Sequence, residues 1–561
     1  MIFAIALMFS LRLSGAVAYL PESILIHTDR KLYISGDALF FSLRLIEYGE
    51  KTEGNFSRFV YVVLRNKSNQ SVQKACLKLS GSKAYGILHL PDTLSSGSYQ
   101  LVAFTQWMRN FGENSFAHAD LCIANLFDKE LSGFEIPVSM VSLNDSVSGQ
   151  QVMSGPVRFE GAENSEYKCG ETVQLKFMLS DTIAKWGDFS LSVREAIPGE
   201  AFDKSNEKTT NYQPFPEKLL FLPEKSNQIL SGTVKRKKGS EEKQEIILLS
   251  ANDSLVNLQY SEAGNEGQFQ FELPAYYEGK ELYLYTLGKD SKSMPVLEIR
   301  DKFELIPGSF PKTSKPSEAF INLVRAHQEF ARIARYYNLS QDYRFSVKEA
   351  QELHAPCLFM NAGSTIYTRD YLPLDNFEEI SREILPSVQV KKSGSSWSVQ
   401  VEDEIHHGFL PGNAALFLNG VLVQDNSEIK EWGSSRIEKI EVLKRPLIYG
   451  NLRFEGVVGI TGKEGETMVV PNNSGMIKTR QPLVMNFGKP VFEEKAIRSD
   501  KSTPDFRSLL YWDPDFRISG KEPGTIEFAG SLHQGEYVVE LKGITSDGRL
   551  IHEWKTITIT R

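Results

Sequence analysis

The chain has 561 residues, more than a single hydrophobic core usually organises, so we expect several domains. Hydrophobic residues at 41% and charged residues at 24% are ordinary for globular proteins and exclude an extensively disordered chain. The formal net charge is −8, and Lys and Arg are dispersed along the sequence, which argues against a nucleic-acid-binding surface.

Residues 1–18 have the pattern of a secretory signal peptide. A short apolar run from Ile2 is followed by Ala16-Val17-Ala18, which matches a signal-peptidase site. Cleavage there makes Tyr19 the mature N-terminus, and without a cysteine at that position no lipoprotein anchor is indicated. No Lys or Arg precedes the apolar run, so a native start upstream of Met1 stays open. No later run is long enough to span a bilayer as a helix. We therefore expect an exported protein in the periplasm or associated with the outer membrane.

Residues 19–129 are predicted to form a first β-sandwich, because runs of β-branched and aromatic residues alternate with turn clusters at sandwich-like spacing. The predicted strands are Ser23–His27, Ala38–Leu45, Phe59–Leu64, Gly86–Leu90, Tyr99–Thr105 and Phe116–Ile123. His27 and Asp29 are interpreted as residues that cap a strand end.

Two motifs in this segment resemble the second domain of alpha-macroglobulins. The opening motif is carried by His27-Thr28-Asp29-Arg30, Tyr33, Gly36-Asp37 and Phe40, and the closing motif runs from Leu90-Pro91 to Gly97-Ser98-Tyr99-Gln100-Leu101. The resemblance implies a macroglobulin-like sandwich. Cys76 and Cys122 lie inside it, and both a disulfide and two unpaired buried thiols fit the sequence.

Residues 130–215 are predicted to be a second macroglobulin-like sandwich, since Tyr167–Phe177 repeats the pattern of Tyr33–Phe40. Its Cys169-Gly170-Glu171 resembles the start of the thioester motif of macroglobulins and complement proteins. Thr172 stands where the acylating Gln is required, and Gln174 lies two residues farther, so we expect no internal thioester.

Residues 216–305 supply the strands of a third predicted β-sandwich, at Leu230–Val234, Glu245–Leu249, Gly267–Glu272 and Glu281–Tyr285. Residues 306–350 are predicted to be a helical linker, with Ser317 as the helix cap. Its apolar residues follow helical spacing, so we expect the helix to pack on a domain, with His327 at the edge of a core.

Residues 351–466 contain a helix at Phe377–Ile384, a strand with a bend at Asn419-Gly420, a second strand at Ile437–Leu443, and a closing strand at Gly456–Thr461. With the Tyr449-Gly450 loop, these motifs resemble the plug domain of TonB-dependent outer-membrane receptors, although Asn419 replaces the usual acid. The stretch Ala415–Lys463 has too little core to stand alone, so we expect neighbouring sandwiches, the apolar face of the 306–350 helix, or another protein to cover it.

Residues 467–561 are predicted to form a C-terminal β-sandwich with strands near Thr525–Phe528, Tyr537–Leu541 and Trp554–Thr560, and with Asp547-Gly548 as a hairpin turn. Its "R..LYW.P" and "G.Y.V...GI..DG" motifs resemble the ending of envelope proteins of Bacteroidetes type that combine macroglobulin and plug domains. The predicted fold class is thus mainly β and multidomain, with macroglobulin/Ig-like β-sandwiches and one small α+β plug-like domain.

The sequence has no HExxH, GxSxG, Walker or strand-linked GxGxxG motif, so we predict no enzymatic activity, no catalytic residues and no cofactor. The densest group of potential metal ligands comprises Glu402, Asp403, Glu404, His406 and His407. A solvated loop explains this group at least as well as hard-metal binding, and no metal site is predicted.

Three classes of function compete: an envelope protein that binds a protein partner, a macroglobulin-type protease inhibitor and a TonB-dependent transporter. A transporter needs a barrel of roughly 22 strands, and fewer than 100 residues follow Gly465. We therefore predict a non-enzymatic envelope protein that binds a protein partner, such as an outer-membrane barrel protein, at or under the outer membrane. The predicted partner-binding loop contains Arg445, Tyr449, Gly450 and Arg453. The alternatives are a macroglobulin-type endopeptidase inhibitor without a thioester and an accessory part of a TonB-dependent transport system.

Overall fold

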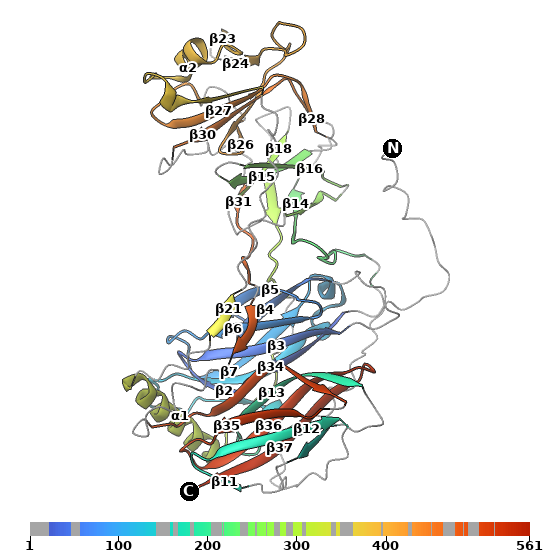
Figure 1. Ribbon diagram of the computed structural model, residues 1–561, viewed down its shortest axis with the longest axis vertical. Coiled ribbons are helices and arrows are strands. Elements are labelled where there is room, and N and C mark those ends of the chain that lie inside the picture. Colours follow the sequence, from blue (N-terminus) through green and yellow to red (C-terminus); the bar gives the residue numbers. More distant parts are fainter. Residues whose placement is uncertain are drawn as a thin grey trace, which may run out of the picture. The chain divides into compact units, whose positions relative to one another are not determined.

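The computed structural model forms two compact units, each assembled from segments far apart in the sequence (Figure 1). Unit 1 comprises Met1–Ser226, Lys302–Glu349 and Val484–Arg561, and unit 2 comprises Asn227–Asp301 and Ala350–Leu483. Strands dominate both units, which confirms the predicted mainly β, multidomain fold class. The predicted signal peptide and Tyr19 lie outside the described residues. The described residues are 22–46, 57–141, 157–160, 166–179, 185–202, 216, 218–235, 245–252, 255–264, 266–273, 281–287, 296–305, 310–337, 344–347, 363–393, 396–423, 429–449, 452–463, 477–485, 487–491, 504–520 and 522–561.

The first sandwich of unit 1 contains all six strands predicted for residues 19–129 and three that were not predicted, β2, β5 and β32. One sheet has the order β1-β3-β6 and the other β2-β8-β7-β4-β5-β32. The strand Phe59–Asn66 is buried over nearly its whole length, as expected for a continuous apolar run in a strand covered on both faces. The strands are β1 (Ser23–Thr28), β2 (Leu32–Ile34), β3 (Ala38–Ile46), β4 (Phe59–Asn66), β5 (Ser71–Lys78), β6 (Lys83–His89), β7 (Gly97–Phe104), β8 (Ala117–Ala124) and β32 (Val484–Met485).

The second sandwich of unit 1 differs from the predicted division of the chain. Strands predicted to belong to separate domains, 130–215 and 467–561, form one body. Its sheets have the orders β10-β12-β35 and β11-β37-β36-β13-β34. The central strand Trp186–Glu195 pairs with Leu509–Ser519 on one side and Gly535–Thr545 on the other. The strands are β10 (Val157–Glu160), β11 (Glu166–Lys168), β12 (Thr172–Leu179), β13 (Trp186–Glu195), β34 (Leu509–Ser519), β35 (Gly524–Ala529), β36 (Gly535–Thr545) and β37 (Leu550–Thr560).

The physical reason for this difference is that strand partners are not encoded by local periodicity. Buried and exposed residues alternate strictly along β12, which identifies a half-buried strand but not its neighbour. The local features were predicted correctly: β36 and β37 form a hairpin with Gly548 at φ +84°, and β12 begins after a turn at Gly170 with φ +71°. Both glycines occupy the left-handed region, where a Cβ is unfavourable.

Helix α1 (Glu318–Tyr336) lies on unit 1, as its apolar face predicts. The Ser317 hydroxyl accepts a hydrogen bond from the Phe320 backbone N–H at 3.2 Å, which confirms the predicted cap. Phe320 and Val324 are fully buried against residues of β2 and β8. The apolar face of this helix is therefore covered within unit 1.

Glu195 of β13 connects α1 to the second sandwich. His327 Nε2 lies 2.7 Å from one carboxylate oxygen of Glu195, and His533 Nε2 lies 3.0 Å from the other. Phe330 of α1 stacks on Phe506 with ring centroids 4.8 Å apart. Burial alone would raise the pKa of Glu195, but the hydrogen bonds from the two histidines outweigh it and lower that pKa to about 2.

This pKa shift predicts how unit 1 responds to acid. The folded pKa of Glu195 lies below its ordinary value of 4.5, so the carboxylate stabilises the fold above pH 4.5. This contribution is lost as the pH falls from 4.5 towards 2. Unfolding by denaturant at a series of pH values should show that Glu195→Gln is less stable at neutral pH but loses less stability over this window. An equal acid loss in wild type and variant would contradict the prediction.

Unit 2 contains the predicted third sandwich. Its sheets have the orders β17-β14-β19 and β16-β15-β18-β31, and the last strand comes from the far end of the unit 2 sequence. All four strands predicted here are present with shifted bounds. The strands are β14 (Ile229–Lys235), β15 (Glu245–Asn252), β16 (Leu255–Glu262), β17 (Gln268–Glu272), β18 (Leu282–Leu287), β19 (Val296–Ile299) and β31 (Ile477–Thr479).

The rest of unit 2 is an α+β module of residues 363–463, built on the sheet β22-β27-β30-β25-β26. The predicted bend is a tight hairpin, in which Asn419 (φ +46°) and Gly420 (φ +80°) connect β25 to β26. The elements are β22 (Ser364–Tyr367), α2 (Phe377–Ile384), β23 (Val388–Ser393), β24 (Ser396–Val401), β25 (Ala415–Leu418), β26 (Val421–Val423), β27 (Ile437–Leu443), β28 (Leu447–Tyr449), β29 (Leu452–Phe454) and β30 (Val457–Gly462).

The module has its own core. Phe377 and Ile380 of α2 and Val399 of β24 are fully buried with Leu416 and Ile440 of the sheet. The hairpin β23-β24 and α2 therefore supply the cover that the sheet needs.

Two two-stranded sheets complete the described fold of unit 1: β20 (Thr313–Ser314) pairs with β9 (Ile136–Pro137), and β21 (Arg344–Val347) with β33 (Phe487–Val491). Among the helices in the part of the chain that the structure describes, none is long and apolar enough to cross a membrane.

Candidate functional site

The predicted partner-binding loop follows β27 and contains the hairpin β28-β29. Arg445 is exposed, and Arg453 in β29 is exposed and donates from Nε to Glu455 Oε1 at 2.6 Å. Tyr449 ends β28, paired with Leu452. The side chain of Tyr449 and the whole of Gly450 lie outside the described residues.

A second segment lies beside this loop, and its position could not be predicted from the sequence. The Glu404 backbone N–H donates to the Lys444 carbonyl oxygen at 2.9 Å, and Lys444 Nζ lies 3.3 Å from Glu402 Oε2. Residues 402–410 therefore lie against the start of the predicted loop. We call the described residues 402–410, 444–449 and 452–455 together the loop surface.

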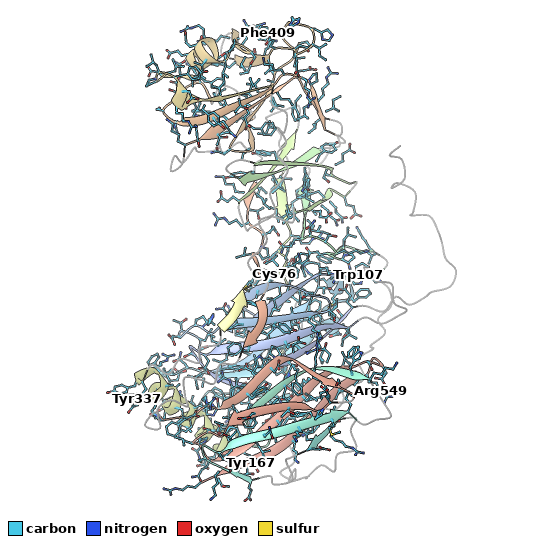
Figure 2. The ribbon with its side chains drawn as sticks, viewed as in Figure 1. Cys76, Trp107, Tyr167, Tyr337, Phe409 and Arg549 are labelled. Atoms are coloured by element: carbon cyan, nitrogen blue, oxygen red, sulfur yellow. The ribbon has the colours of Figure 1, made fainter. Side chains whose placement is uncertain are left out.

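The loop surface exposes large apolar side chains. Ile405 is 74% exposed, Phe409 43% and Ile448 68%. Phe409 is labelled on the module in Figure 2. Three exposed apolar residues on two adjacent segments are more typical of a protein-binding surface than a single exposed residue is. The sequence carries one signal for this exposure: the three apolar residues stand among charged and polar residues.

The five potential metal ligands at residues 402–407 form a loop stabilised by its own hydrogen bonds. Asp403 accepts the Ile405 backbone N–H at 2.9 Å and lies 2.7 Å from His406 Nδ1. The backbone hydrogen bond and the His406 contact lower the pKa of Asp403. Within the described residues, no three His, Cys, Asp or Glu side chains come together in a way that could hold a metal ion.

Cys169 lies in the turn before β12, where the Glu171 backbone N–H donates to the Lys168 carbonyl oxygen at 3.0 Å. Its sulfur lies 3.6 Å from the Leu532 carbonyl oxygen. Thr172 begins β12, and Gln174 follows on the same strand as an exposed residue paired with Glu527. The segment is thus a turn leading into a strand.

We therefore expect methylamine to leave the protein mass unchanged, because Thr172 has no amide that could form a thioester with Cys169. Intact-mass measurement after methylamine treatment checks this. A mass gain that disappears in Cys169→Ala would contradict it.

Cys76 and Cys122 are both buried thiols, and no disulfide joins them in the described first sandwich. Cys122 Sγ instead lies 3.9 Å from Met140 Sδ. Burial raises the pKa of the Cys122 thiol far above its ordinary value, so this group is inert at neutral pH. Cys357 lies outside the described residues.

Asp29 caps a strand as predicted. Its carboxylate accepts the Phe40 backbone N–H at 2.9 Å and the Tyr33 hydroxyl at 2.7 Å, and it pairs with Arg30 at 3.0 Å. Burial raises the pKa of Asp29 despite these contacts. His27 does not cap the strand, because its ring contacts the second sandwich: Nδ1 lies 2.7 Å from Ser190 Oγ.

Comparison with known proteins gave no match in sequence and several matches in structure. No protein-family model and no curated protein sequence matches the chain. Solved structures that match include Escherichia coli alpha-2-macroglobulin activated by trypsin, at 9% identity and a TM-score of 0.24 over 98% of this chain and 42% of that one. The same protein activated by porcine elastase matches at 8% identity and a TM-score of 0.23, over 96% and 44%.

Salmonella alpha-2-macroglobulin reacted with methylamine matches at 9% identity and a TM-score of 0.16, over 96% of this chain and 23% of that one. The chain thus spans less than half the length of these solved proteins. TM-scores this low do not establish a common arrangement, so the macroglobulin and plug resemblances stay predictions.

Proposed function

We propose that the chain is a non-enzymatic, exported cell-envelope protein that binds a protein partner at or under the outer membrane through the loop surface of its α+β module. The observation that supports this proposal best is the exposure of Ile405, Phe409 and Ile448 on two adjacent segments. Burial of exposed apolar side chains of this size against a partner lowers the free energy of the complex.

The charges on the loop surface favour a protein partner over an anionic or cationic small molecule. Lys444 and Arg453 are paired with Glu402 and Glu455, and Asp403 lies beside His406. The surface therefore presents apolar groups between locally balanced charges, which is the pattern of a core and rim in a protein interface.

The proposal is tested by affinity capture from solubilised envelopes with mass-spectrometric identification. Ile448→Asp should remove one captured protein, because a charge would be buried at the contact. Leu372→Asp is the matched control, because Leu372 is 84% exposed on the same module. It lies away from the loop surface: Thr368, four residues earlier, contacts Ile437 at the opposite end of β27. An identical set of captured proteins with both folded variants and wild type would refute the proposal.

A further inference from the structure

Several polar and charged contacts join the two sandwiches of unit 1. The Ser42 hydroxyl and the Arg44 guanidinium of β3 donate to the Pro514 carbonyl oxygen of β34, at 3.1 and 3.0 Å. Arg44 pairs with Asp188 at 3.1 Å, and Lys83 pairs with Asp515 at 2.7 Å. Phe40 packs on Leu509 and Trp512 as a small apolar cluster. An interface of this composition resembles a contact between separable partners more than the core of one domain.

His27 of β1 lies in this interface and is 2% exposed. Ser190 and Ser192 of β13 contact its ring, at 2.7 Å from Nδ1 and 3.4 Å from Nε2, and both serines are fully buried. The indole of Trp512 meets the ring edge-on, with centroids 5.1 Å apart. Every group that touches the ring in these contacts belongs to the second sandwich.

The hydrogen bonds identify Nδ1 as the ring nitrogen that carries a proton. The Ser190 hydroxyl donates to the Lys542 carbonyl oxygen at 3.2 Å, so its oxygen can only accept from His27. His27 therefore donates from Nδ1, and Nε2 is left as the acceptor that faces the Ser192 hydroxyl. The neutral imidazole satisfies this arrangement, with the Ser192 hydroxyl as the donor to Nε2.

Charged groups near the ring act in both directions: Glu540 favours a second proton, and Lys542, His552 and Arg194 oppose it. The neighbours in the second sandwich are Glu540 and Lys542 of β36, His552 of β37 and Arg194 of β13. From its own sandwich, Ser42 lies opposite His27 in the strand register, and Arg44 follows on the same strand. Glu540 already accepts from Arg194 and His552, at 2.8 and 2.9 Å.

We propose that this interface is acid-sensitive: the two sandwiches stay in contact, which we call the closed state, only while His27 is neutral. When the two sandwiches separate, His27 reaches water and can take up a proton, which favours the open state. Burial is the main cause that lowers the pKa of His27 well below 6.5, and Lys542, His552 and Arg194 add to it against Glu540. His27 has a lower pKa in the closed state than in the open state, so acidification protonates it in the open state first. The closed state is therefore lost as the pH falls below 6.5. The open-to-closed ratio should rise by up to about tenfold per pH unit.

The test is hydroxyl-radical oxidation of the full chain in sub-denaturing urea, at about pH 7.5 and about pH 5.5, read by peptide mass spectrometry. Trp512, 2% exposed, reports opening, and Trp186, 50% exposed in the same chain, is the reference for radical dose. Tyr537, fully buried in the second sandwich, reports unfolding of that sandwich. We expect Trp512 oxidation to rise on acidification while Tyr537 stays protected.

Three variants identify the sensor. In His27→Gln the rise should disappear, whereas His552→Gln and the exposed surface variant His89→Gln should retain it. The proposal is overturned if wild-type Trp512 oxidation does not change with pH, if Tyr537 oxidises together with Trp512, or if the rise persists in His27→Gln. If His27→Gln does not fold, His27→Asn replaces it, and the wild-type profile alone still decides the first two outcomes.

Discussion

Deleting residues 504–561 is expected to unfold the second sandwich completely, including β12 and β13 in the first half of the chain. The deletion removes β34, β35, β36 and β37, which pair with both of these strands and with β11. It also exposes buried side chains such as Phe177, Phe189 and Leu191, which lie in one core with residues of the deleted segment. An isolated pair of strands with no second sheet is marginally stable at best. Hydrogen exchange followed by mass spectrometry should show loss of protection in peptides covering β12 and β13.

Two features make this outcome specific. The α+β module of unit 2 has its own core and should keep its protection in the same sample. Removal of Arg561 alone, an exposed residue after β37, should leave β12 and β13 protected. Full protection of β12 and β13 after the large deletion would mean that 130–215 is an independent domain and that the strand pairing described above is wrong.

Replacing Arg194 by methionine is expected to destabilise unit 1 by about 3–5 kcal/mol, the cost typical of removing one partner from a buried ion pair. The guanidinium is almost fully buried and donates to Glu200 at 2.9 Å and to Glu540 at 2.8 Å. Without Arg194, the carboxylates of Glu200 and Glu540 stay buried with fewer cations nearby to offset their negative charge. The free energy of unfolding from urea titration at neutral pH measures the effect.

Arg517→Met is the matched control, because it removes the same charge from the same sandwich. Arg517 is 71% exposed and lies 3.7 Å from Asp515, so its loss should change stability by less than about 1 kcal/mol. Equal effects of the two substitutions would show that the buried network contributes no more than an ordinary surface pair.

The local elements were predictable because their signals are local. Strand β27 and helix α2 have the predicted bounds, since alternation and helical spacing define them within a few residues. The partners of β13 were not predictable. Its register with β34 joins residues more than 300 positions apart, and many strands of similar pattern compete for the same place.

The loop surface was predicted in part, for the same reason. The position of Arg445 and Arg453 on an exposed loop followed from the motif pattern. The neighbouring segment at residues 402–410 was interpreted as a solvated loop, since nothing local indicates the hydrogen bond from Glu404 to Lys444. Likewise His27 was interpreted as a cap, because Ser190 lies 163 residues away in the sequence.

Photo-crosslinking tests the proposed binding surface most directly. A photoreactive amino acid is placed at Ile448, at Ile405 and, as a control, at Leu372, all exposed on the α+β module. After illumination of intact cells, crosslinked products are identified by mass spectrometry. We predict that positions 448 and 405 crosslink to the same envelope protein and that position 372 does not. Crosslinking to that protein from position 372 alone, or to no protein from 448 and 405, would contradict the assignment of the loop surface as the site of partner binding.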